Sequence, residues 1–189
     1  MQKALILIDY INDICNSDGK IPSCAMRIKE ENIVEKVNKL LNVARKNNWL
    51  IIWIIVGFDK NYLEANIKSP IFSKAKANQA LLRDSWGTEI LSDLEYDDNE
   101  LIICKNAVNP FHATNLEHVL RANEVTEVFL AGVSTEVAVN SCARDAHDRG
   151  YLVNVISDCC ASGNIENHNA TLKMLAYMTN VITSAEIII

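Results

Sequence analysis

The stretch EVFLAGVSTEVAVNSCARDAHDRGY, residues 127–151, joins a short apolar run, a glycine turn and a long helical pattern. The apolar run ends at Gly132, and the helical pattern begins at Ser134 or Thr135 and stops before Gly150, which is placed to end a helix. This order predicts a buried strand that leads through a turn into a helix. α/β enzymes often place a nucleophile or bind a charged ligand group at such a turn. The stretch therefore predicts an α/β fold with a site directly after this strand.

Short runs rich in Ile, Val and Leu recur along the chain and alternate with amphipathic segments. Unbroken apolar runs of this length are typical of strands covered on both faces, as in a parallel sheet. The alternation predicts a three-layer α/β/α fold with a doubly wound, mainly parallel sheet of six strands, in a single domain over residues 1–189. The predicted strands are 4–8, 50–56, 101–104, 127–132, 152–157 and 180–184, and the predicted helices are 28–48, 114–123, 134–149 and 165–178.

Two local features add detail to this prediction. Thr114 followed by Glu117 is a capping-box signature for the start of a helix. Region 57–98 is the one long irregular segment, and an insertion of this length in a compact domain is usually a binding loop or lid. Its aromatic residues either wall a pocket or pack the loop onto the core, and both interpretations stay open. These residues are Phe58, Tyr62, Phe72 and Trp86.

The composition excludes several classes of protein. The net charge is −6, and no Lys/Arg cluster stands out, which argues against a nucleic-acid partner. The apolar run 4–8 is too short for a signal-peptide core and is closed at once by Asp9, so we expect a cytoplasmic protein. The six cysteines are therefore expected to be reduced and mostly buried, and their spacing matches no structural zinc site.

Charged residues stand at the ends of two predicted strands. In open α/β sheets, ligands bind outside the carboxyl ends of the strands, where Asp9, Lys105 and the turn 132–138 fall. A carboxylate there can act as a general base if its surroundings raise its pKa. A lysine beside it would hold it ionised or stabilise charge that develops on a substrate. Taken alone, each residue is better explained as a turn cap or a solvated charge, but the pair favours a site.

Three ordered motifs carry a resemblance to a known family. They are DYINDI at 9–14, KNAVNPFHATNL at 105–116, and GVSTEVAV at 132–139, which continues into ARDAHDRGY and DCCA. Over nearly its whole length, the chain resembles the isochorismatase-like hydrolases, also called cysteine hydrolases. Asp9, Asn12 and Asp13 match the first motif, but Ile11 stands where glutamine is usual. Ala138 stands where this family has its nucleophilic cysteine.

The resemblance implies a mechanism and a set of site residues. In the family, the carboxylate that matches Asp9 takes the proton of the thiol, and the lysine that matches Lys105 steadies the charges. The N–H groups of Ser134 and Ala138 would form the oxyanion hole, and the Val133–Ser134 peptide would be cis. The expected substrate-binding residues are Val133, Ser134, Asn12, Phe111, His112 and Trp86; for His112, a solvated position in a surface loop is the competing interpretation.

The resemblance also bears on metals, cofactors and partners. Nicotinamidases of this family bind a metal through histidines after the second strand, whereas this chain has Asp59 there and no histidine, so we expect no metal. No nucleotide-binding glycine motif is present, and we expect no cofactor. The expected partners are a small-molecule substrate and further copies of the chain, as a homodimer or homotetramer. Residues 17–28 and 57–98 are the segments expected to meet a neighbouring subunit.

Three hypotheses account for Ala138. The first is a natural variant in which Asp9 acts as general acid or base in the hydrolysis of a small amide, ureido or vinyl-ether compound. The second is a cysteine amidohydrolase whose nucleophile has been replaced by alanine. The third is a catalytically silent homologue that still binds the ligand. Cys142 lies one helical turn beyond position 138 and is expected to be a packed core thiol, not a substitute nucleophile.

Overall fold

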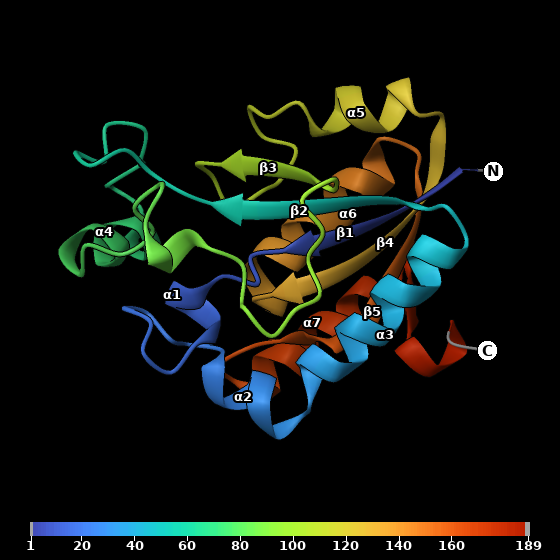
Figure 1. Cartoon of the computed structure of the whole chain (residues 1–189), viewed down its shortest axis with the longest axis horizontal. Helices are drawn as coiled ribbons and strands as arrows, with labels where there is room; N and C mark the ends of the chain where they lie inside the picture. Colours follow the sequence, from blue (N-terminus) through green and yellow to red (C-terminus); the bar gives the residue numbers. More distant parts are fainter. Residues whose placement is uncertain (1, 188–189) are drawn as a thin grey trace.

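Six parallel strands form one sheet in the order β3-β2-β1-β4-β5-β6 in the computed structural model, which describes residues 2–187 (Figure 1). The chain places β2 and β3 on one side of β1 and the later strands on the other, so the sheet is doubly wound, as predicted. The strands are β1 (Gln2–Ile8), β2 (Leu50–Val56), β3 (Leu101–Lys105), β4 (Val125–Val133), β5 (Leu152–Ala161) and β6 (Asn180–Ile182). The helices are α1 (Asn12–Cys15), α2 (Ala25–Glu30), α3 (Ile33–Lys46), α4 (Pro70–Ala77), α5 (Leu116–Ala122), α6 (Asn140–Asp148) and α7 (Ile165–Leu175).

Helices cover both faces of the sheet, which confirms the predicted three layers. Because successive strand residues point to opposite faces, Ala4, Ile6 and Ile8 pack into one core with residues of α5, α6 and α7. Leu5 and Leu7 pack into a second core with α2 and α3. The apolar run of β1 is therefore buried on both sides, which is why it shows no alternation in the sequence.

Several predicted boundaries differ from the structure. The predicted helix 28–48 is divided into α2 and α3, because Asn32 adopts a left-handed backbone with φ 51°. The predicted helix 134–149 begins as a short π-helix, Thr135–Val139, and continues as α6. The fifth strand extends to Ala161, and its pairing with β4 shifts register between Leu130 and Gly132. Gly150 has φ +86°, as expected for the residue that ends α6.

The predicted capping box does not form. α5 begins at Leu116, and the Thr114 hydroxyl accepts its N–H at 3.2 Å and donates to the Pro110 carbonyl at 2.6 Å. Glu117 points away from the helix start and pairs with Arg121. The prediction was wrong because Arg121, one turn further along the same helix, and Arg149, which follows α6, pair with the Glu117 carboxylate.

Region 57–98 contains α4 and a 3₁₀ turn, Trp86–Thr88. Phe58, Tyr62 and Phe72 pack together in a small third core beside the sheet, so for these rings the packing interpretation is largely correct. Trp86, by contrast, is 47% exposed. Within residues 2–187, no helix is both long and apolar enough to cross a bilayer.

Gly132 allows β4 to approach β1 closely. Its φ is +152°, and a Cβ at this position would lie 2.3 Å from the Ile8 carbonyl oxygen. Gly132→Ala is therefore expected to lower the free energy of unfolding by at least about 2 kcal/mol, measured by urea denaturation. Gly150→Ala is the matched control, because φ is +86° there but no atom lies within 4 Å of the new Cβ. Equal losses in the two variants would show that backbone conformation, and not crowding against Ile8, sets the cost.

Candidate active site

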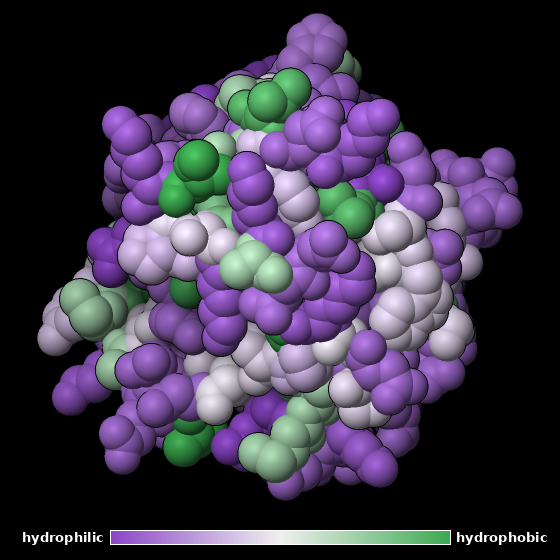
Figure 2. Space-filling view, turned by 90° about the vertical axis from the view of Figure 1, so that its left-hand side faces the viewer, coloured by the Kyte–Doolittle hydropathy of each residue, from purple (hydrophilic) through white to green (hydrophobic). Residues whose placement is uncertain are grey.

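A cavity of about 560 Å³ lies at the carboxyl ends of the strands, beside the point where the strand order reverses between β1 and β4. Its walls come from residues 20–23, from α4, from residues 105–108 and from residues 133–138. Most of its lining is apolar. Figure 2 looks onto this edge of the sheet, where exposed apolar side chains (green) stand apart among hydrophilic ones. The cavity combines a polar base with apolar walls, as small-molecule sites commonly do.

Asp9 and Lys105 form a buried ion pair at the base of this cavity. Asp9 follows β1 with φ +56°, and Lys105 ends β3. The Lys105 Nζ lies 2.7 Å from Asp9 Oδ2, and each residue is 3% exposed. Asp9 Oδ1 is buried and has no hydrogen-bond partner among residues 2–187. Burial raises the pKa of the Asp9 carboxyl above its usual 3.8, and the ammonium of Lys105 only partly opposes this shift.

The turn after β4 forms the adjoining wall. The Val133–Ser134 peptide is cis, as the resemblance implied. The Ser134 carbonyl accepts the N–H groups of Val137 and Val139 and so shapes the first turn of the helix. Val133, Ser134 and Ala138 all line the cavity together with Asp9 and Lys105. The acid, the amine and the turn, which are far apart in the sequence, therefore meet in one place.

Four expected substrate-binding residues do not line the cavity. Asn12 is buried, and its Nδ2 donates to the Trp86 carbonyl at 2.8 Å, so these two residues join α1 to the loop above it. Phe111 is buried in the core, and His112 is exposed in the surface loop. The structure thus places these four residues outside the cavity lining, because the direction of a loop side chain is set by packing, which a motif match does not contain.

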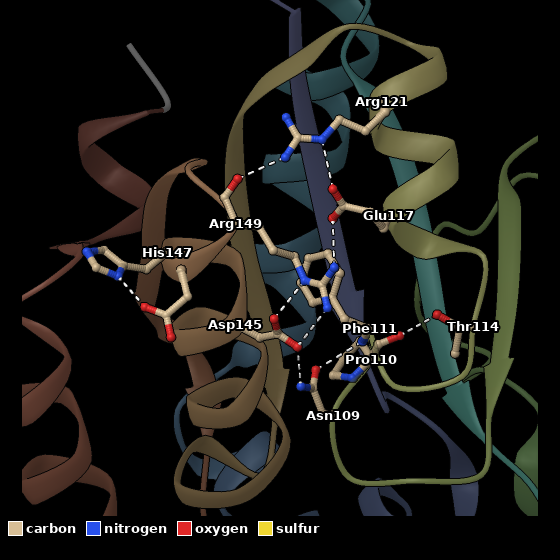
Figure 3. Close-up of polar contacts among 10 residues, drawn as sticks. Asn109, Pro110, Phe111, Thr114, Glu117, Arg121, Asp145, His147 and Arg149 are labelled. Carbon is tan, nitrogen blue, oxygen red and sulfur yellow. Dashed lines mark hydrogen bonds and ion pairs between the residues drawn. The ribbon is translucent and has the colours of Figure 1, made fainter.

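Phe111 belongs instead to a polar and aromatic cluster between the loop after β3 and α6 (Figure 3). The Arg149 guanidinium lies 4.7 Å from the centre of the Phe111 ring and pairs with Asp145 at 2.6 Å. Asp145 also accepts from Asn109 Nδ2 at 2.6 Å, and Glu117 lies 3.4 Å from Arg149. The ion pair Asp145–Arg149 is thus one part of a network that fixes the loop whose first residues line the cavity.

Several further residues line the cavity that no motif in the sequence indicated. One face of α4 is turned toward the cavity. It carries Ile71 and Lys74 and, just beyond the end of the helix, Asn78, which are three and four residues apart. Glu136 lies in the turn itself, and Lys20 comes from the segment before α2. The spacing on α4 was visible in the sequence, but nothing there indicated that this helix packs over the strand ends.

Asp13 joins two walls of the cavity. Its buried carboxylate accepts the N–H of Lys20 at 3.1 Å and the N–H of Leu81 at 2.6 Å. Asp13→Asn would turn one acceptor oxygen into a donor that faces another donor. We expect a loss of about 1.5–3 kcal/mol in the free energy of unfolding and faster hydrogen exchange at Leu81.

The exposed Asp93→Asn is the matched control for this substitution, since it removes the same charge from the surface. Unchanged exchange at Leu81 in Asp13→Asn would contradict the role of Asp13 in holding the walls together.

Two of the thiols around the site, those of Cys142 and Cys160, are deeply buried. Cys142 is fully buried, and burial raises the pKa of its thiol well above the usual value. Burial likewise raises the pKa of the Cys160 thiol to about 12. These two cysteines lack the exposed, electropositive surroundings that make a thiol reactive.

The region after the second strand holds Asp59, whose carboxylate accepts the N–H groups of Asn61 and Leu63. No cluster of three His, Cys, Asp or Glu side chains suited to a metal occurs within residues 2–187.

Comparisons with known proteins agree with the fold described above. The family model for the isochorismatase domain matches residues 3–187. The chain belongs to the isochorismatase family. It is 26% identical to the ureidoacrylate amidohydrolase RutB of Acinetobacter baylyi, over 90% of this chain and 76% of that protein.

Solved structures of the isochorismatase family share the fold. A cysteine hydrolase from Pseudomonas syringae pv. phaseolicola superposes with a TM-score of 0.88 at 25% identity, over 99% of this chain and 91% of that one. An isochorismatase-like hydrolase from Alkaliphilus metalliredigens superposes with a TM-score of 0.84 at 25% identity, over 98% and 97% of the two chains. The predicted fold and family are thereby confirmed.

Proposed function

We propose that this member of the isochorismatase family hydrolyses the C–N bond of a small amide or ureido compound, with water as the nucleophile and Asp9 as the general base. The observation that carries this proposal is the state of the Asp9 carboxylate. One of its oxygens is held by Lys105 at 2.7 Å, and the other is buried beside the cavity without a hydrogen-bond partner among the described residues. A carboxylate in this state is oriented and has one oxygen available to take a proton.

The proposed reaction has two proton transfers. Asp9 Oδ1 accepts a proton from water as the water oxygen forms a bond to the carbonyl carbon of the substrate. The carbonyl oxygen becomes an oxyanion, which accepts hydrogen bonds from the N–H groups of Ser134 and Ala138. Asp9 then gives the proton to the leaving nitrogen, and the C–N bond breaks. The products are a carboxylic or carbamic acid and an amine or ammonia.

Three observations support this chemistry over a thiol route. Ala138 carries a methyl group at the position that lines the cavity, so Asp9 has no thiol to activate there. Cys142 is fully buried in the core and is not in contact with the cavity. Burial also raises the pKa of Asp9 above its usual value, so that its carboxylate is a stronger base toward water than an ordinary aspartate. The name of the relative RutB supports an amide or ureido substrate.

Ala138 also favours a second candidate function, a homologue that binds a ligand without turning it over. The cavity and the charged pair are retained in this case, but no reaction follows. A panel of small amides, ureido acids and one vinyl ether, assayed for ammonia release and carbonyl products, distinguishes the two. We expect hydrolysis of at least one amide or ureido compound. Binding without any product would favour the silent homologue, and turnover of the vinyl ether alone would overturn C–N bond cleavage.

A further inference from the structure

A second carboxylate, that of Glu136, lies on the wall of the same cavity. Glu136 is partly buried in the turn between Ser134 and Ala138, and its Oε2 atom is fully buried. This oxygen has no hydrogen-bond partner among residues 2–187. Buried polar atoms are almost always paired, and an unpaired carboxylate oxygen is unfavourable. The unpaired oxygen therefore calls for a donor from outside the chain.

The backbone around Glu136 is held in place. The hydroxyl of the preceding residue, Thr135, lies 2.8 Å from His168 Nδ1, and Thr135 is fully buried. The Glu136 carbonyl accepts from Asn140 Nδ2 at 3.4 Å. These contacts fix the backbone from which the Glu136 side chain extends to the cavity.

The lysines of the cavity do not supply the missing donor. Lys105 is paired with Asp9, and Lys20 Nζ donates to the Gln79 carbonyl at 2.7 Å. Lys74 is exposed on α4 and is not within hydrogen-bond distance of Glu136 Oε2. With the charges of Asp9 and Lys105 balanced against each other, Glu136 is the remaining carboxylate of the cavity.

We infer that Glu136 determines substrate specificity by accepting a hydrogen bond from a protonated amine, so that the enzyme takes small amides that carry an amino group. This inference rests on the proposed function for the bond that is cleaved. Burial in a largely apolar cavity strengthens a charge-assisted hydrogen bond and penalises an anion placed against the same carboxylate.

Three matched amides test the inference: β-alaninamide, butanamide and succinamate, which share a three-carbon propanamide unit whose third carbon carries an ammonium, a methyl or a carboxylate. Binding is measured by NMR titration, and hydrolysis by ammonia release, in the wild-type protein and in Glu136→Gln. The wild type should prefer β-alaninamide by about tenfold, and Glu136→Gln should lose this preference. The exposed Glu166→Gln removes the same charge elsewhere and should retain it.

Each outcome is decisive for the inference. Preferential binding of β-alaninamide that depends on Glu136 but produces no ammonia would support the inference and refute the proposed function. Hydrolysis without a preference, or with a preference unchanged in Glu136→Gln, would overturn the inference and leave the proposed function standing. A preference for succinamate would also overturn it and would point to Lys20 and Lys74. No measurable binding or turnover of β-alaninamide would overturn it as well.

Discussion

Asp9→Asn is expected to lower the rate of hydrolysis by about 10²–10⁴-fold, because the amide has no basic oxygen that can take the proton of the attacking water. Asparagine keeps the size of the side chain and its position at the end of β1. The measurement is kcat on the best substrate from the amide and ureido panel. Turnover that is indifferent to this substitution would refute the mechanism but not the fold.

The same substitution leaves Lys105 buried without its counter-charge, and the free energy of unfolding is expected to fall by about 3–5 kcal/mol. A double variant separates this effect from catalysis. Asp9→Asn combined with Lys105→Met removes both charges, so it should recover most of the stability and remain inactive. Recovery of activity together with stability would show that Asp9 acts only through folding.

The pH dependence follows from the direction of the Asp9 pKa shift. The base is the ionised carboxylate, so activity is lost as the pH falls through the pKa of Asp9. Because burial raises this pKa above 3.8, the acid limb of the profile lies at higher pH than for an ordinary aspartate. A limb at or below the ordinary value would contradict the role of a desolvated base.

Ala138→Cys is expected to increase amide hydrolysis by about two orders of magnitude or more, since it places a thiol beside an available carboxylate oxygen and a lysine. The reaction would then pass through an acyl-enzyme, which mass spectrometry of the quenched protein detects. Ala138→Ser is the matched control, because a hydroxyl at the same position is far harder to ionise and should give little gain.

A second control addresses the thiol that the chain already has. Cys142→Ser should not change the rate in either background, because Cys142 is buried in the core away from the cavity. If Ala138→Cys gave no gain while turnover still depended on Asp9, the turn would not direct the side chain of residue 138 at the carbonyl carbon. That result would also count against a replaced cysteine as the origin of the site.

Much of the fold followed from the sequence because the signals were local. The short Ile/Val/Leu-rich runs placed all six strands, and their lack of alternation indicated a sheet covered on both faces. Errors arose where a competing ion pair or a local backbone conformation overrode the structure that the sequence pattern predicted. Glu117 pairs with Arg121 instead of capping α5, and the predicted helix 28–48 breaks at Asn32.

Part of the candidate site could be predicted from the sequence and part could not. The meeting of Asp9, Lys105 and Ala138 could be predicted, because the carboxyl ends of parallel strands lie at one edge of a sheet and each residue stands at or just beyond such an end. The walls could not be predicted from the sequence. Phe111 turned into the core, and α4 turned one face to the cavity, because each is oriented by contacts with residues far away in the chain.

The sequence by itself determined the six strands in their order along the chain, the family, and the residues at the strand ends, because regular spacing and ordered motifs are present along the chain. Only the tertiary structure decided which side chains enclose the cavity and which carboxylate oxygens lack a partner there. Burial and pairing are properties of the assembled core: Asp9 Oδ1 and Glu136 Oε2 are buried and lack a partner among residues 2–187 only once the strand ends and the turn after β4 have come together at the cavity.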